Sequence, residues 1–126
     1  MKIKILLISI AWTIPSSWAA SCYDTAMTQA SISDCANAET KDRDKDLNTA
    51  YKALVNKHAS DKAFREKLKK AQRAWIAYRD QELDLVDSDG SISSTCRSQR
   101  LAQLNKERTE YFKSLLDQKE GEVCAP

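Results

Sequence analysis

Breakers of secondary structure are scarce in this chain. Its 126 residues include two glycines and two prolines, while 30% of the residues are charged. Sheets need turn residues at short intervals and long helices do not, so this composition favours helices over strands. Histidine is almost absent as well, because His58 is the one histidine of the sequence. A general base needs a partner and none is evident for His58, so we expect a binding protein rather than an enzyme.

The N-terminus has the pattern of a secretory signal peptide. Two early lysines precede an apolar stretch from Ile5 to Trp12, and small residues surround Ala19. The stretch is shorter than the roughly 20 residues that cross a bilayer as a helix. We therefore predict a signal peptide over residues 1–19, cleaved after Ala19, and a periplasmic or secreted domain over residues 20–126. No membrane insertion is expected after cleavage.

Without that signal the chain is electrically neutral. The sequence has 20 basic and 18 acidic residues, and Lys2 and Lys4 belong to the signal, which leaves eighteen of each. A neutral chain without a polybasic segment predicts binding neither to nucleic acid nor to an anionic membrane. Lipidation of Cys22 is an alternative to soluble export. However, Ala19 stands where a lipobox normally has Leu, and lipidation would leave an odd number of cysteines.

Three segments have apolar residues spaced by three and four, which predicts amphipathic helices. We place them at about residues 34–58, 60–86 and 93–119, with a short extra helix at 24–30. Ser33 or Asp34 is the predicted cap of the first long helix, and Ser60 with Asp61 that of the second. The predicted buried stripes are Cys35, Ala38, Leu47, Ala50, Tyr51, Leu54 and Val55; Phe64, Leu68, Ala71, Trp75, Tyr78 and Val86; and Cys96, Leu101, Leu104, Tyr111 and Leu115, with Phe112 as a further candidate.

Each stripe covers one side of its helix, so the helices must pack against one another. Short connections make consecutive helices antiparallel. The predicted fold is therefore all-α, an antiparallel three-helix bundle with an additional short N-terminal helix, stabilised by disulfides.

Four cysteines remain after export: Cys22, Cys35, Cys96 and Cys124. An even number in an oxidising compartment indicates two disulfides, and the absence of any CxxC pair argues against zinc. Cys96 and Cys124 should lie at opposite ends of the third helix, whereas Cys35 and Cys96 should begin helices at the same end of the bundle. Geometry thus favours Cys35–Cys96 together with Cys22–Cys124. No metal and no cofactor are expected.

The segment between the second and third helices is rich in acids. Asp87, Asp89, Gly90 and Ser93 match part of a calcium-binding EF-hand loop, but its first and last ligands would fall on Leu85 and Cys96. A capped turn between helices is the better interpretation.

The most distinctive run extends from Ala71 to Asp80. Trp75 and Tyr78 share a helix face there, and Arg79 is predicted to pair with Asp44 or Glu39 on the facing helix. This arrangement favours a structural role over an exposed binding patch. A second distinctive motif lies in the first long helix. The signature residues of the two motifs, for which we predict a structural role, are Asp44, Leu47, Asn48, Tyr51, Gln72, Arg73, Trp75, Tyr78, Arg79 and Asp80.

The pattern of these signature residues resembles that of the lysozyme inhibitor LprI-like family. Cys22 and Cys35 on either side of Gln29, and the later Cys96 and Arg108, fit the same pattern, so the resemblance covers essentially the whole mature chain. One departure is Leu83, where many members have Cys, and the disulfides of relatives are therefore not transferred. The resemblance implies an envelope or secreted helical protein that binds a protein partner, such as a c-type lysozyme, and inhibits it.

A protein inhibitor of lysozyme would block a cleft that works through two carboxylates. Because animal lysozymes are generally basic, an acidic loop would assist the encounter. Asp84, Asp87 and Asp89 around Gly90 are the predicted loop, with an ordinary polar turn as the alternative. The alternative function is that of an envelope immunity or stress-related interaction protein of the same fold with a non-lysozyme partner.

Overall fold

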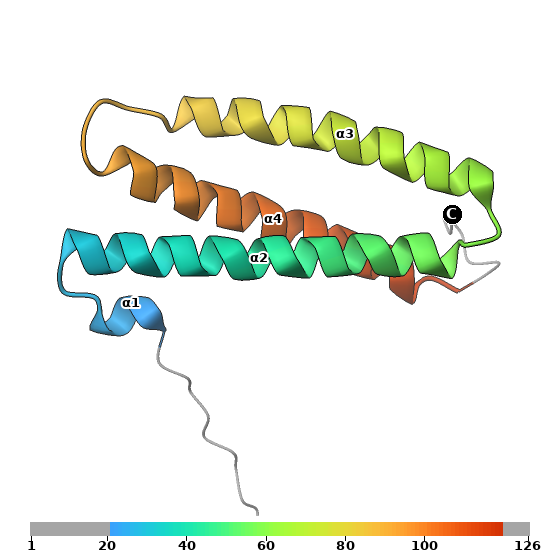
Figure 1. Cartoon of the computed structure of the whole chain (residues 1–126), viewed down its shortest axis with the longest axis horizontal. Helices are drawn as coiled ribbons and strands as arrows, with labels where there is room; N and C mark the ends of the chain where they lie inside the picture. The colour runs from blue at the N-terminus through green and yellow to red at the C-terminus, as the bar shows by residue number, and fades with distance from the viewer. Residues whose placement is uncertain (1–20, 120–126) are drawn as a thin grey trace, which may run out of the picture.

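The computed structural model describes residues 21–119, and the predicted signal peptide lies outside them. Its helices are α1 (Cys22–Thr25), α2 (Gln29–Lys57), α3 (Lys62–Leu85) and α4 (Ser93–Asp117). In Figure 1 the three long helices lie along a common direction, and α1 folds back beside the start of α2. The prediction of an all-α bundle with a short N-terminal helix is confirmed.

The most extensive helix–helix contact is between α2 and α4, which run in the same direction. The helix that connects them in the chain, α3, runs in the opposite direction. Small polar side chains hold the first halves of α2 and α4 together. The hydroxyls of Ser33 and Thr95 are hydrogen-bonded, and Thr40 donates to the carbonyl oxygen of Ser98 at 2.8 Å. Such small residues let two helix backbones approach closely, which explains why this pair dominates the packing.

An apolar core occupies the other half of the bundle, where α2, α3 and α4 converge. Its buried members are Leu47, Ala50, Leu54, Leu68 and Phe112. Tyr111, which we predicted to be buried, is instead 50% exposed, whereas its neighbour Phe112 is 0% exposed. Adjacent residues point about 100° apart on a helix, so α4 can bury one of them and not both. Ala38 and Cys96, also predicted to be buried, are exposed.

The predicted disulfide pairing is wrong. Cys22 bonds to Cys35, with 5.7 Å between their Cα atoms, and Cys96 is free and exposed. Cys35 and Cys96 do lie in the first two turns of α2 and α4 at one end of the bundle, but the residues that meet there are Ser33 and Thr95. A side chain one or two positions away points in another direction, so Cys35 is turned toward α1. Cys124 falls beyond the described residues.

Hydrogen bonds satisfy backbone groups at the start of α2 and at the end of α4. Thr28 caps α2 by accepting from the backbone N–H of Ser31, so the helix begins earlier than predicted and Ser33 and Asp34 lie inside it. At the far end, Nζ of Lys57 donates to the carbonyl oxygens of Leu115 and Leu116, which satisfies the C-terminus of α4. Within residues 21–119, none of the helices has the length and apolar character that crossing a bilayer requires.

Asp61 is the N-cap of α3, as predicted, and accepts from the backbone N–H of Phe64 at 2.9 Å. We expect Asp61→Ala to lower the free energy of unfolding by about 1 kcal/mol, because the N–H of Phe64 loses its acceptor. Urea denaturation followed by circular dichroism measures this. Ser60 is exposed and does not cap the helix, so Ser60→Ala serves as the matched control. Equal losses in the two variants would contradict the assignment of the cap.

Candidate functional site

The α3–α4 loop, residues 86–92, lies at one end of the bundle (Figure 1). Leu85 and Ile92 stand at its two ends and are 79% and 47% exposed. Gly90 lies within it with φ at 128°, a conformation that side-chain-bearing residues rarely adopt. Two exposed apolar side chains thus flank the acidic turn identified in the sequence.

The two carboxylates of the loop, Asp87 and Asp89, and that of Asp84 at the end of α3 differ in their interactions. Asp84 lies 3.4 Å from a guanidinium nitrogen of Arg97. Asp87 accepts from the hydroxyl of Ser93 at 2.8 Å, and that hydroxyl accepts from the backbone N–H of Ser88. Asp89 is exposed and, among the interactions of residues 21–119, takes part in none. The predicted capped turn between helices is therefore present. Asp89 is the acid of this turn whose side chain forms no hydrogen bond or ion pair with residues 21–119.

No cluster of three or more metal-binding side chains exists between residues 21 and 119. The hydroxyl of Ser93 closes the turn by bonding to Asp87 rather than facing outward with it. The loop is thus organised by its own hydrogen bonds.

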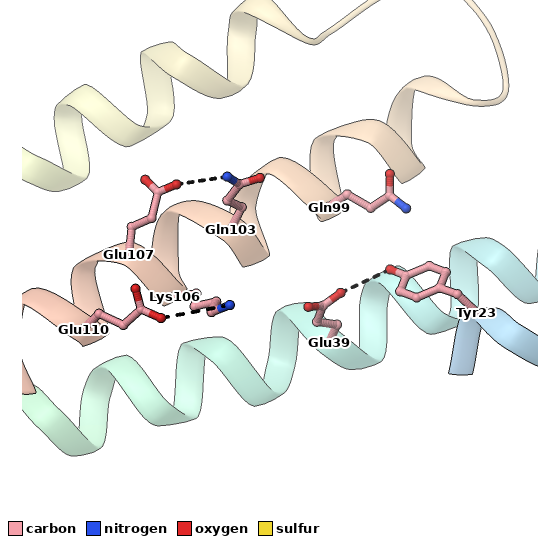
Figure 2. A pocket seen from close by; sticks show the side chains of 7 residues that line it. All are labelled: Tyr23, Glu39, Gln99, Gln103, Lys106, Glu107 and Glu110. Atoms are coloured by element: carbon pink, nitrogen blue, oxygen red, sulfur yellow. Dashed lines mark hydrogen bonds and ion pairs between the residues drawn. The ribbon is translucent and has the colours of Figure 1, made fainter. Parts of the chain in front are cut away.

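A second feature, which the sequence did not predict, is an open hollow between α1, α2 and α4 of about 530 Å³. Figure 2 shows the side chains that line it. The hydroxyl of Tyr23 donates to Glu39 at 3.3 Å, and the amide of Gln103 donates to Glu107 at 3.0 Å. The residues lining it are Tyr23, Glu39, Gln99, Gln103, Lys106, Glu107 and Glu110.

Three carboxylates and one ammonium group make this hollow a polar surface with an excess of negative charge. Lys106 and Glu110 form a long ion pair at 4.0 Å. The hollow offers acceptors for basic side chains of a partner, and it shows no arrangement of a nucleophile with a base. The sequence feature that could have indicated this hollow is the spacing of Gln99, Gln103 and Glu107. Polar residues four positions apart lie on one face of α4.

The signature residues of α2 are divided between the core and local hydrogen bonds. Leu47 is buried, and Tyr51 packs against the core cluster. Asn48 donates to the backbone carbonyl and the carboxylate of Asp44 one turn earlier, at 2.9 and 3.1 Å. Leu47 and Tyr51 therefore contribute to the core, while Asn48 and Asp44 form contacts within α2.

The predicted pairing of Arg79 with Asp44 or Glu39 is wrong. Arg79 instead pairs with the adjacent Asp80 at 2.8 Å and lies 5.5 Å from the centre of the Trp75 ring. The reason is that α3 packs mainly against α4, so α2 is not the helix that faces Arg79. Tyr78, another predicted core residue, is 52% exposed. Arg73 and Ala71 are exposed too.

Gln72 and Trp75 reach toward α4 and meet Arg108 there. Nε of Arg108 donates to Oε1 of Gln72 at 3.1 Å, and its guanidinium carbon lies 5.6 Å from the centre of the Trp75 ring. The α3–α4 contact is therefore built from signature residues of both helices.

His58 ends α2, as predicted, and its ring stacks on Phe64 with 3.8 Å between ring centres. Its position at the junction of α2 and α3 is that of a packing residue.

Comparison with known proteins identifies the group to which this helical chain is related. Residues 20–112 match the profile of the family described as Lysozyme inhibitor LprI. An uncharacterized protein of Rhizobium meliloti (strain 1021), R02472, is 34% identical over 110 residues, which cover 76% of this chain and 79% of that protein. No solved structure matches. Because the profile covers most of the chain, including α1, α2, α3 and most of α4, this protein belongs to the LprI lysozyme inhibitor family.

Proposed function

We propose that this protein is exported to the periplasm or beyond, binds a c-type lysozyme and inhibits it by occluding the catalytic cleft. The observation that carries the proposal is membership of the LprI lysozyme inhibitor family across residues 20–112. An inhibitor of this kind needs no chemistry of its own, since it has only to keep the polysaccharide away from the two catalytic carboxylates.

We assign the contact to the α3–α4 loop, with Asp84, Asp87, Asp89 and Gly90 as its polar part. Support comes from the exposure of Leu85 and Ile92 beside these residues. Exposed apolar side chains next to charges are typical of protein-binding surfaces, where the apolar groups supply affinity and the charges steer the encounter. Of these three acids, Asp89 is the one whose side chain has no partner among residues 21–119, so it would lose no hydrogen bond on binding.

Inhibition is tested by following the clearing of a bacterial cell-wall suspension by a c-type lysozyme, with and without the oxidised mature protein. We expect dose-dependent inhibition that weakens as salt rises, because salt screens an acidic loop from a basic enzyme. Absence of inhibition at large excess would refute the proposed function.

The loop assignment is tested by the double variant Leu85→Ser, Asp89→Asn. We expect its affinity for lysozyme, measured by calorimetry, to fall at least about tenfold, which corresponds to roughly 1.4 kcal/mol. Glu66→Gln is the matched control, since Glu66 is an exposed acid near the opposite end of α3. A wild-type affinity in the double variant would remove the loop from the interface while leaving inhibition itself intact.

A further inference from the structure

Arg108 has an unusual environment on the α3–α4 face. Its guanidinium carbon lies 5.6, 5.2 and 4.6 Å from the ring centres of Trp75, Tyr111 and Phe112. Gln72 accepts a hydrogen bond from its Nε at 3.1 Å. The cation is thus held by three aromatic rings and one neutral amide.

No carboxylate in the described part of the chain forms an ion pair with Arg108, although other arginines of α4 have acidic partners. Arg100 lies 2.7 Å from Glu82, and this hydrogen bond raises the pKa of Arg100. Burial instead lowers the pKa of Arg108. Its positive charge has therefore lost part of its hydration without gaining a countercharge from residues 21–119, which is an unfavourable state that an incoming anion would relieve.

The same face remains open to a ligand. Arg108 and Trp75 are half-buried, and Tyr111 is 50% exposed beside them. Tyr78, 52% exposed, stands one helical turn after Trp75 on α3. Tryptophan, tyrosine and arginine in a partly desolvated cluster are the residue types that dominate binding energy at protein interfaces.

We propose that Arg108, Trp75 and Tyr111 form a docking point for a short peptide segment of a partner protein that presents a carboxylate between apolar side chains. The guanidinium receives the carboxylate through its free N–H groups, and the exposed tyrosine ring packs against the flanking apolar side chains. A planar guanidinium that is already stacked on rings loses little entropy on forming such bonds.

The occupant is a short segment rather than a second copy of this chain. The large exposed apolar side chain that contacts Arg108 is Tyr111, and Ile76 and Tyr78 are the exposed ones within one turn of Trp75 on α3. A stable dimer buries about 800 Å² on each partner, which this small cluster does not supply. The site also lies about 22 Å along α4 from Ser93, where the α3–α4 loop ends, so the two surfaces act separately.

Trp75 provides a direct probe, because the other two tryptophans, Trp12 and Trp18, lie in the predicted signal peptide. We would titrate the oxidised mature protein with acetyl-Leu-Glu-Leu-amide and with acetyl-Leu-Gln-Leu-amide while recording Trp75 fluorescence and the NMR signal of its indole N–H. The expected result is saturable binding of the Glu peptide and at least tenfold weaker binding of the Gln peptide. Arg108→Gln should remove this discrimination, whereas Arg73→Gln, an exposed arginine on α3, should preserve it.

Equal binding of the two peptides, or unchanged discrimination in Arg108→Gln, would overturn the proposal. So would a wild-type dimer that Arg108→Gln converts to a monomer in light scattering, since a second copy would then be the occupant. If Arg108→Gln does not fold, Arg108→Lys keeps the charge and should weaken the Glu peptide severalfold through loss of the planar geometry. None of these results depends on lysozyme, so the inhibition assay and this titration succeed or fail independently.

Discussion

Phe112→Ala is expected to lower the free energy of unfolding by about 3–5 kcal/mol, the largest effect of any change considered for this protein. Phe112 is 0% exposed and belongs to the core cluster in which α2, α3 and α4 converge. Removing its ring both loses buried apolar area and leaves a cavity that rigid helices cannot close. Since small domains are stable by roughly 5–15 kcal/mol, the variant should be largely unfolded in moderate urea. Urea denaturation followed by circular dichroism at several temperatures measures the loss.

Tyr111→Ala is the matched control, because it removes a ring of similar size from the adjacent position. Tyr111 is half-exposed and touches Phe112 with 6.1 Å between ring centres. We expect a cost of about 1 kcal/mol, from lost contacts with Arg108 and Phe112. A larger cost for Tyr111 than for Phe112 would mean that α4 is rotated relative to the structure described here.

The second large effect is expected from the Cys22–Cys35 disulfide. Cys22→Ala should lower the free energy of unfolding by about 3 kcal/mol, because the bond closes a loop with a sequence separation of 13 and restricts the unfolded chain. Cys22 is exposed, so the substitution itself removes little packing. Denaturation of the wild type with and without reductant gives an independent measure, and the reduced wild type should match the variant.

The pairing itself can be tested chemically. Met27 lies between Cys22 and Cys35 and is exposed. In the variant Cys96→Ala, Cys124→Ala, the partner that remains for Cys22 is Cys35. Cyanogen bromide cleavage of that variant at Met27 should therefore yield fragments that stay joined until they are reduced. Cys96→Ala is the control and should change stability by less than about 0.5 kcal/mol, as expected for an exposed position without a disulfide among the described residues. Fragments that separate without reductant would contradict the Cys22–Cys35 bond.

Periodicity and end signals predicted the helices well because both are local properties of a helix. The three-and-four spacing of residues such as Leu47, Ala50 and Leu54 indicates which side of a segment is apolar, whatever the segment packs against. Asp61 was identifiable as a cap because its carboxylate needs only a backbone N–H three residues later. Thr28 performs the same task for α2, but the predicted cap was Ser33 or Asp34, which lie closer to the apolar stripe.

The contacts between helices depended on information that no local pattern contains. Arg79 was assigned to a partner on α2, yet the packing of α3 against α4 left it beside Asp80 and Trp75. The disulfide was assigned across the bundle, yet the backward fold of α1 brought Cys22 to Cys35. In both cases the error came from the direction of a side chain, which changes by about 100° with each residue.

The sequence by itself thus determined that this protein is helical and which residues carry the family signature. Only the tertiary structure decided that Phe112 rather than Tyr111 fills the core, that Asp89 has no partner among residues 21–119, and that Gln72 and Trp75 gather around Arg108. The physical reason is that helix formation follows from interactions within about four residues, whereas the rotation of each helix about its axis is set by the best joint packing of all of them.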